Sequence, residues 1–320
     1  MKAAVYHRFG GPEVVAPEEL PTPTPTGDEV LVRVLAACVS TSDTAARAGS
    51  PWFARLGFGP IRPRQKVLGS DFAGRVEALG PSARRFAVGD VVCGATNVAM
   101  GAHAEYVVVS ESWPIEPVPA GVDPAEAAAL VDATAMSFLR ETADLQAGQH
   151  LLVNGASGAV GSAAVQLARG LGAQVAGTSS AANLDFVRSL GAAALDYADP
   201  DSVIAAGPYD VVFDASGRLG YGRARRALTA DGLYMTTVPS LAILGQMLWT
   251  RWFGQRRATL SFTGLRSSER VAADLRETVS WAERGELNAH IDGTYPLDRV
   301  ADAYRHVERG KRGHVVLTFP

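Results

Sequence analysis

The sequence contains little cysteine and has no excess of one charge. Its 320 residues include only two cysteines, Cys38 and Cys93, too few for a disulfide framework or a cysteine-rich structural zinc site. Lysine and arginine number 30 against 33 aspartates and glutamates, and the net charge of -3 gives no general attraction to nucleic acid or an anionic membrane. We therefore expect a protein of a reducing, cytoplasmic compartment that does not bind nucleic acid.

Long apolar runs are also missing. No stretch reaches the ~20 apolar residues that span a bilayer, and residues 1–7 lack the apolar core of a signal peptide. We expect a soluble protein without an integral membrane span. A chain of 320 residues, 47% apolar and 20% charged, is long for a single hydrophobic core, so two domains are expected.

The pattern of the chain changes near residue 120. Before it, short alternating runs such as 29–34 and 104–109 lie between glycine and proline turns, which is typical of a β-barrel or sandwich. After it, alanine-rich helices alternate with strands, which predicts a doubly wound parallel sheet in an α/β fold. The expected helices are near 124–142, 159–170 and 183–190, and the expected strands are 150–154, 174–178 and 210–214. A last helix from near Asp298 precedes a strand within 313–319 that could return to the first domain.

An apolar strand ending at Asn154 leads into a glycine-rich turn and then an amphipathic helix. The turn reads Ala156-x-Gly158-x-x-Gly161, a variant of the dinucleotide-binding fingerprint. Gly158 has no side chain where a diphosphate would approach, Gly161 is small where helix meets strand, and the helix N-terminus offers free N–H groups. We predict a dinucleotide site here; the alternative is a plain strand-to-helix turn.

The end of the second strand bears on the choice of nicotinamide cofactor. In NAD-binding units an acidic residue there accepts hydrogen bonds from the ribose 2'-hydroxyl, whereas this strand ends in Thr178, Ser179 and Ser180. These hydroxyls and the nearby Asn183 leave room for a 2'-phosphate, so NADPH is expected rather than NADH. No arginine or lysine stands immediately beside them, although a phosphate dianion normally takes a cationic partner.

The sequence resembles the zinc-independent quinone oxidoreductases, the ζ-crystallin-like branch of the medium-chain dehydrogenase/reductase superfamily. The resemblance rests on the opening residues 1–6, the segments 67–74 and 89–92, the glycine turn, and the stretch from 186 to 197. It implies a GroES-like β-rich catalytic domain (1–120), a Rossmann NADPH-binding domain (121–286) and a return segment (287–320) that completes the catalytic domain. The cofactor would lie in the cleft between the domains.

The resemblance also implies roles for single residues. Tyr197 would lie by the adenine, Arg309 could reach the 2'-phosphate, and Thr134 would lie near the nicotinamide, with Val160 behind its ring. The candidate cofactor-binding residues are Thr134, Ala156, Ser157, Gly158, Ala159, Val160, Gly161, Thr178, Ser179, Ser180, Asn183, Tyr197, Ser216 and Arg309.

Compared with the zinc-containing alcohol dehydrogenases of the superfamily, the chain lacks the zinc ligands. Those enzymes carry them in Cys-x-x-Asp and Gly-His-Glu segments, and the matching stretches here are Ser-Thr-Ser-Asp at 40–43 and Gly-Ser-Asp at 69–71. Serine is a poor zinc ligand beside thiolate and imidazole, so we expect no metal. We interpret Cys38 and Cys93 as core residues, and His103 is the one histidine whose family counterpart lies near the site entrance.

Without a Lewis acid, hydride delivery to a quinone or enone is favoured over alcohol oxidation. The candidate catalytic residues are Ser40, Ser42 and Asp43. Ser42 matches a proton-relay hydroxyl of the zinc-dependent relatives, and the other two flank it. The alternative is that all three only satisfy backbone groups in a turn. Many family members have asparagine at position 40, which leaves the substrate contact open.

Two further stretches allow more than one interpretation. Trp52, Phe53 and Phe58 either wall an apolar substrate pocket or pack in the core. Residues 241–257, with an apolar body and a basic end, could cap the substrate cleft, join two subunits or touch a membrane surface, and we favour the first two. Residues 259–264 resemble an edge strand through which such folds pair, so a homodimer is expected. Besides a quinone or enone reductase, a zinc-free alcohol or carbonyl oxidoreductase and a catalytically idle NADPH-binding protein remain alternatives.

Overall fold

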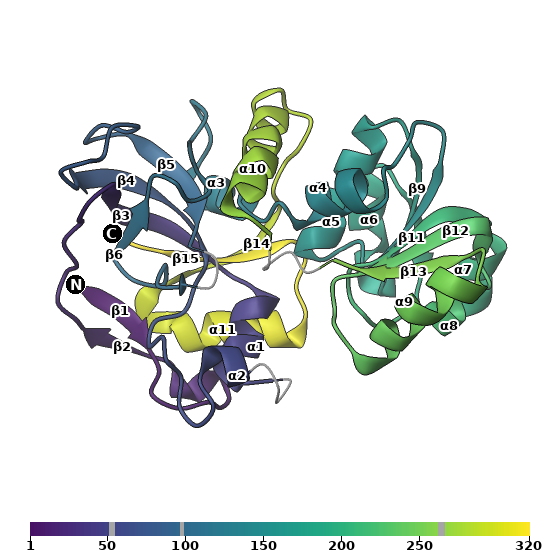
Figure 1. Cartoon of the computed structure of the whole chain (residues 1–320), viewed down its shortest axis with the longest axis horizontal. Coiled ribbons are helices and arrows are strands. Elements are labelled where there is room, and N and C mark those ends of the chain that lie inside the picture. Colours follow the sequence, from purple (N-terminus) through teal and green to yellow (C-terminus); the bar gives the residue numbers. More distant parts are fainter. Residues whose placement is uncertain (51–54, 97–98, 262–265) are drawn as a thin grey trace. The chain divides into compact units, whose positions relative to one another are not determined.

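The computed structural model describes residues 1–50, 55–96, 99–261 and 266–320, which form two compact units (Figure 1). The β-rich unit comprises Met1–Asp132, Arg266–Glu283 and Ala289–Pro320, and the parallel-sheet unit comprises Ala133–Leu265 and Arg284–Asn288. In the part of the chain so described, no helix is both long enough and apolar enough to cross a membrane.

The β-rich unit is built around one mixed sheet. Its strands are β1 (Lys2–Val5), β2 (Ala16–Glu19), β3 (Glu29–Val39), β4 (Asp71–Leu79), β5 (Val91–Ala95), β6 (Tyr106–Ser110), β7 (Ile115–Pro117), β14 (Ile291–Pro296) and β15 (His314–Thr318). Its helices are η1 (Pro12–Val14), α1 (Thr41–Ala48), α2 (Arg55–Phe58), α3 (Pro124–Leu130), α10 (Ser268–Glu283), η7 (Leu297–Arg299) and α11 (Val300–Arg309). The main sheet runs β14-β15-β3-β4-β5-β7, with β6 also paired to β3, and β1 and β2 form a separate hairpin.

The C-terminal strand returns to the first part of the chain, as predicted. Strand β15 pairs antiparallel with β3, and Val316 lies opposite Cys38. Valines and alanines of β3 are buried because both faces of this central strand are covered, one by α11 and the other by α3. Phe58, a candidate pocket residue, packs against the first of these cores, whereas Trp52 and Phe53 lie outside the described residues.

The parallel-sheet unit is doubly wound, which confirms the predicted α/β fold. Its strands are β8 (His150–Asn154), β9 (Gln174–Ser179), β10 (Ala193–Asp196), β11 (Tyr209–Asp214), β12 (Leu228–Thr236) and β13 (Arg257–Leu260). Its helices are α4 (Thr134–Ser137), η4 (Phe138–Thr142), α5 (Ala159–Gly170), η5 (Ala181–Asn183), α6 (Leu184–Ser189), α7 (Pro200–Ala205), α8 (Tyr221–Ala224) and α9 (Leu241–Phe253). All pairings are parallel in the order β10-β9-β8-β11-β12-β13. This is the strand order of dinucleotide-binding sheets, in which ligands bind beyond the carboxyl ends of the first and fourth strands.

The helix expected over 124–142 is divided into three pieces, α3, α4 and η4. The division falls where the chain passes from one unit to the other, between Asp132 and Ala133. The alanines of α3 pack on β3 and β4, and α10 packs on α3 and β7, so both helices belong to the β-rich unit. The predicted boundaries at 120 and 286 put both helices in the Rossmann domain. The structure puts them in the β-rich unit, because their apolar faces are buried in its core.

Candidate active site

The turn between β8 and α5 has the shape that a diphosphate site requires. A Cβ atom on Gly161 would lie 2.1 Å from the carbonyl oxygen of Gly155, so only glycine allows the helix to approach the turn this closely. Gly155 itself has a positive φ of 86°. A Cβ atom placed on Gly158 would have its nearest protein neighbour 3.5 Å away, which is ordinary contact. The space beside Gly158 is thus left open by the protein, as the approach of a ligand to the backbone needs.

Helix α5 begins at this turn without a side-chain cap. Gly158 is its N-cap residue and, having no side chain, supplies no cap to the N–H groups of the first turn. The N–H groups of that turn have no intrahelical acceptors and form a favourable site for an anion. Ser157, Ala159 and Val160 are partly exposed around it, whereas Ala156 is fully buried and packs against β9. These features fit the diphosphate of a dinucleotide cofactor.

A buried polar network lies directly under the turn. Asn154 donates from Nδ2 to Asp214 Oδ1 at 2.7 Å and to Ser216 Oγ at 2.8 Å. Its Oδ1 accepts a hydrogen bond from the Thr178 hydroxyl at 2.6 Å. The network therefore ties together the carboxyl ends of β8, β9 and β11. Ser216, a predicted cofactor residue, is one of its members and is partly exposed.

Asp214 is the centre of this network and was not identified from the sequence. It is fully buried and also accepts hydrogen bonds from the backbone N–H groups of Leu219 and Gly220, at 2.9 and 3.1 Å, and from the Tyr234 hydroxyl at 2.9 Å. Burial, followed by the negative charge of Asp214, raises the pKa of Tyr234 well above its usual value, so this hydroxyl stays a donor. An aspartate at the end of an otherwise apolar strand is the sequence signal that could have identified it.

The polar residues predicted to face a 2'-phosphate differ in their exposure to solvent. Thr178 and Ser179 are buried, the first bonded to Asn154 and the second donating to the Ser180 carbonyl at 3.1 Å. Both hydroxyls therefore make hydrogen bonds within the protein, because the end of β9 is buried. Ser180 and Asn183 are partly exposed.

Two other predicted cofactor residues of the parallel-sheet unit lie at element ends. Tyr197 follows β10 and is 60% exposed, with its backbone N–H bonded to the Ser179 carbonyl at 3.1 Å. Thr134 is the first residue of α4 and is partly exposed. Both side chains are thus reachable from solvent.

In the β-rich unit, Ser40 and Asp43 form a capping box at the start of α1. The Ser40 backbone N–H and hydroxyl donate to Asp43 Oδ2 at 2.8 and 2.6 Å, and the Ser40 hydroxyl accepts from the Asp43 N–H at 3.1 Å. Asp43 is buried and its other oxygen accepts the N–H of Gly69 at 3.1 Å. This geometry favours the capping interpretation for both residues. Ser42 is exposed on the first turn of the same helix.

Asp71, at the start of β4, has a carboxyl with a raised pKa. Loss of hydration raises the pKa of its carboxyl to about 8, with a further contribution from the negative charge of Asp132, against the opposing hydrogen bond that Ser70 Oγ donates at 2.8 Å. Asp71 occupies the position at which zinc-dependent relatives have the acidic residue of Gly-His-Glu. The raised pKa favours the protonated form of this partly exposed carboxyl near neutral pH.

The cysteines and His103 are structural. Cys38 and Cys93 are buried, and burial is the main cause of the raised pKa of each thiol, about 12 for Cys93. His103 is fully buried, with Nε2 donating to the Cys38 carbonyl at 2.8 Å and Nδ1 accepting from the Tyr304 hydroxyl at 3.3 Å. Its ring also lies against Gly69, and its place near a site entrance stays a prediction. Within the described residues, no three His, Cys, Asp or Glu side chains are grouped to hold a metal ion.

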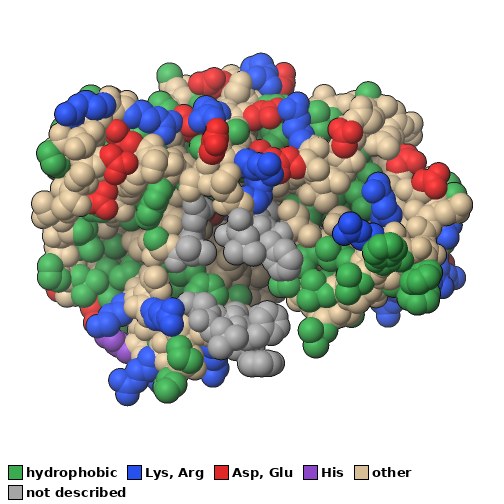
Figure 2. Space-filling view, viewed as in Figure 1, with side chains coloured by type: hydrophobic (Ala, Val, Ile, Leu, Met, Phe, Trp, Pro, Cys, Tyr) green, Lys and Arg blue, Asp and Glu red, His purple; other side chains and the backbone are tan. Residues whose placement is uncertain are grey.

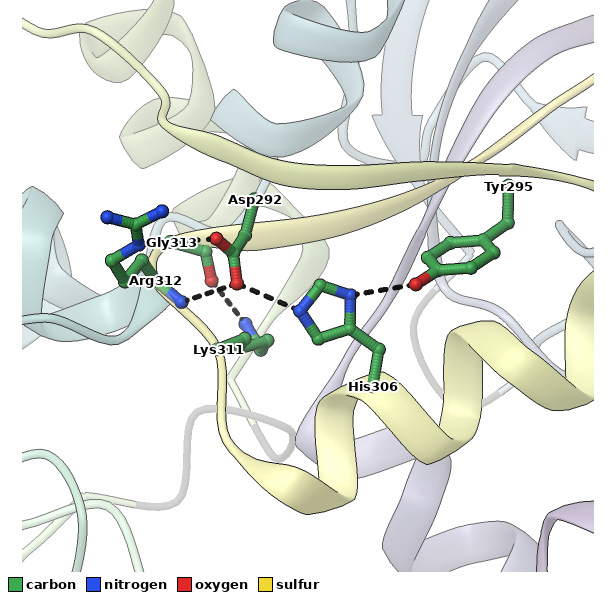
Figure 3. Close-up of polar contacts among 6 residues, drawn as sticks. All are labelled: Asp292, Tyr295, His306, Lys311, Arg312 and Gly313. Atoms are coloured by element: carbon green, nitrogen blue, oxygen red, sulfur yellow. Dashed lines mark hydrogen bonds and ion pairs between the residues drawn. The ribbon is translucent and has the colours of Figure 1, made fainter.

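Arg309 is exposed at the end of α11, and the loop after it is held by Asp292 of β14 (Figure 3). Asp292 accepts hydrogen bonds from the backbone N–H of Arg312 and from His306 Nε2, both at 2.9 Å. The His306 ring accepts in turn from the Tyr295 hydroxyl at 3.1 Å. Burial opposes ionisation of Asp292, but these hydrogen bonds outweigh it and keep its pKa below the usual value.

We expect the exchange Asp214→Asn to destabilise the parallel-sheet unit by about 3 kcal/mol or more, because an amide would turn a donor toward groups that already donate. Tyr234→Phe removes a single hydrogen bond and should cost only about 1 kcal/mol. Urea unfolding followed by circular dichroism measures both. Equal stability of Asp214→Asn and the wild-type protein would contradict the role given to this carboxylate.

We expect Asp71→Asn to stabilise the protein increasingly as the pH rises. The wild-type protein takes up a proton at Asp71 on folding between pH 4 and 8, because the folded pKa is about 8 against 3.8 for the free side chain, so its stability falls over that range. The amide cannot ionise, and its Tm gain should be small near pH 4 and on the order of 5 °C at pH 8. The exposed Asp298→Asn serves as the control. A Tm difference that does not vary with pH would show that Asp71 is not desolvated.

Two family models match the chain, the alcohol dehydrogenase GroES-like domain over residues 26–120 and zinc-binding dehydrogenase over residues 190–317. Over 336 residues it is 30% identical to the chloroplast envelope quinone oxidoreductase homolog of Arabidopsis thaliana, covering 99% of this chain and 98% of that protein. It is 31% identical over 338 residues to the NADPH-dependent alkenal/one oxidoreductase, chloroplastic, of the same plant, covering 100% and 80%.

A further match is to part of a much larger protein. The chain is 33% identical over 284 residues to pikromycin polyketide synthase component PikAII of Streptomyces venezuelae, covering 81% of this chain but only 7% of that protein. Among solved structures, the quinone oxidoreductase from Coxiella burnetii has a TM-score of 0.89 at 26% identity, covering 100% of this chain and 99% of that one. The chain therefore belongs to the quinone oxidoreductase branch of the medium-chain dehydrogenase/reductase superfamily, whose members are oxidoreductases that use a nicotinamide cofactor.

Proposed function

We propose that the chain is an NADPH-dependent reductase that transfers hydride to a quinone or an α,β-unsaturated carbonyl compound without zinc. The observation that carries the proposal is the open space at Gly158 beneath the uncapped first turn of α5. This is where a nicotinamide dinucleotide would place its diphosphate. The names of the Arabidopsis relatives, a quinone oxidoreductase homolog and an alkenal/one oxidoreductase, support the substrate class.

The preference for NADPH rests on the side chains around the end of β9. No acidic residue ends this strand, so the 2'-hydroxyl of NADH would lack its usual acceptor. Ser180 and Asn183 would face the 2'-phosphate, and Tyr197 would lie on the adenine. Arg309 would supply the cation, because a phosphate dianion is best bound by charge-assisted hydrogen bonds.

The remaining chemistry is proton supply and orientation. When bound, NADPH supplies the hydride. Thr134 and Val160 would position the nicotinamide ring, and the exposed Ser42 hydroxyl would hydrogen bond to the substrate oxygen. The carboxyl of Asp71, with a pKa of about 8, is a second candidate source of the proton. The serines at positions 40 and 70 leave zinc without its usual ligands, which supports a metal-free reaction.

We further propose a cytoplasmic homodimer. Strand β13 is the last in the order of the parallel sheet, and an outer strand of this kind can pair with a second copy. Residues 262–264 of the predicted edge strand lie outside the described residues.

The function is tested by following nicotinamide absorbance with purified, metal-analysed protein. We expect oxidation of NADPH by p-benzoquinone, phenanthrenequinone and an α,β-unsaturated ketone, with little or no oxidation of NADH and no dependence on added zinc. Alcohol oxidation with NADP, or activity that requires bound zinc, would contradict the reductase proposal. NADPH binding without turnover of any of these compounds would instead support a catalytically idle binding protein.

The cation is tested by Arg309→Ala. Loss of a charge-assisted hydrogen bond should raise the KM for NADPH about tenfold or more, with kcat little changed, while the KM for NADH stays the same. Arg305→Ala is the matched control, since Arg305 is exposed on the same helix and pairs with Asp302. An equal effect on both cofactors would mean that Arg309 does not bind the 2'-phosphate.

A further inference from the structure

Helix α9 (Leu241–Phe253) carries two apolar faces, and the described part of the chain covers only one of them. The covered face is formed by Ile243, Met247 and Thr250, which are spaced by four and three residues and pack in the core of the parallel-sheet unit beside β13. The Thr250 hydroxyl accepts the N–H of Ala258 of β13 at 3.1 Å, which fixes this face against the sheet.

The opposite face consists of large apolar side chains in solvent. Leu241, Leu248 and Trp252 follow one another at spacings of seven and four residues and are 87%, 66% and 74% exposed. Trp249 and Phe253 extend this face, 65% and 73% exposed, with their ring centroids 4.8 Å apart. Figure 2 shows hydrophobic side chains gathered over this region, with basic side chains beside them. A contiguous exposed apolar face of this kind marks a binding surface, because single exposed apolar residues are normal but clusters are not.

The chain segment around this face carries mostly positive charge. Residues 215–265 contain seven arginines and a single acidic residue, Asp231, although the whole chain has a net charge of -3. Arg251 lies on α9 itself, and Arg256 and Arg257 follow its C-terminus; all three are exposed. The surface thus combines leucine and aromatic side chains with positive charge.

We propose that the exposed face of α9 docks on an anionic lipid surface, with the helix lying in the plane of the membrane interface. Leucine and tryptophan side chains would enter the boundary between head groups and acyl chains, where aromatic rings are favoured. The arginines would bind the negatively charged head groups and add electrostatic attraction to the apolar contact. A second copy of the chain fits less well, because a two-fold contact through this face would bring two arginine-rich surfaces together.

The proposal is tested with the full-length protein and extruded vesicles, either of phosphatidylcholine alone or with phosphatidylglycerol added. In co-sedimentation we expect binding to the anionic vesicles, release of most of the protein by high salt, and weak binding to the neutral vesicles. Tryptophan emission should shift to shorter wavelength on binding, because Trp249 and Trp252 leave water.

Variants of the exposed face show whether lipid binds at α9 or at another surface of the protein. Trp252→Glu and the double exchange Arg251→Glu/Arg257→Glu should each lower the partition coefficient at least about tenfold. Ile61→Glu is the matched control, since Ile61 is an apolar residue of the β-rich unit that is 85% exposed. Unchanged Tm and NADPH oxidation in all variants show that folding and the active site are intact.

Three outcomes would overturn the proposal. The first is that the wild-type protein fails to bind anionic vesicles. The second is that Ile61→Glu lowers binding as much as Trp252→Glu. The third is that the wild-type protein does not bind lipid and light scattering shows that Trp252→Glu converts a dimer to a monomer. This result would mean that the face binds a second copy of the chain.

Discussion

The contact between Gly161 and the carbonyl oxygen of Gly155 is the constraint on which the candidate cofactor site depends. Any larger residue at position 161 would push α5 away from the turn, because a Cβ there would come within 2.1 Å of that oxygen. The close approach places the free N–H groups of the first turn of α5 at the carboxyl edge of the sheet, next to the open space at Gly158. Asn154, Asp214 and Thr178 hold this edge together from below.

The buried and the exposed polar residues have different tasks. Asp43, Thr178 and Asp214 are enclosed, and each accepts or donates hydrogen bonds that join separate elements of the chain. Their removal would leave buried groups unpaired, which is strongly unfavourable inside a protein. Ser42, Ser180, Tyr197 and Arg309 keep their side chains at least partly in solvent. Of these two groups, the second is the one that can contact a cofactor or substrate.

Much of the fold could be predicted from the sequence because its signals are local. The strand ending at Asn154, the glycine turn and the helix from Ala159 follow one another in the chain, and the structure confirms all three. The return of the terminal strand was also predictable, because an apolar strand after a helix needs a partner sheet. The break of the expected 124–142 helix was not, since it depends on where the chain leaves one core for the other.

The polar networks could not be predicted because they join residues far apart in the chain. Asp214 meets Asn154 only because β11 lies beside β8, a pairing across 60 residues. Asp292 meets His306 only through the packing of α11 on β14. Hydroxyl residues likewise look alike in a sequence, so the burial of Thr178 and Ser179 became visible only in the folded chain. The sequence left a capping and a catalytic role open for Ser40, and only the structure favours capping.

A crystal structure of the protein with NADP tests the central claim most directly. We expect the diphosphate to lie on the first turn of α5 at Gly158, with the 2'-phosphate beside Ser180 and Asn183. The guanidinium of Arg309 should contact that phosphate. A cofactor bound elsewhere, or a first turn of α5 that remains empty at saturating NADP, would contradict the proposed cofactor site.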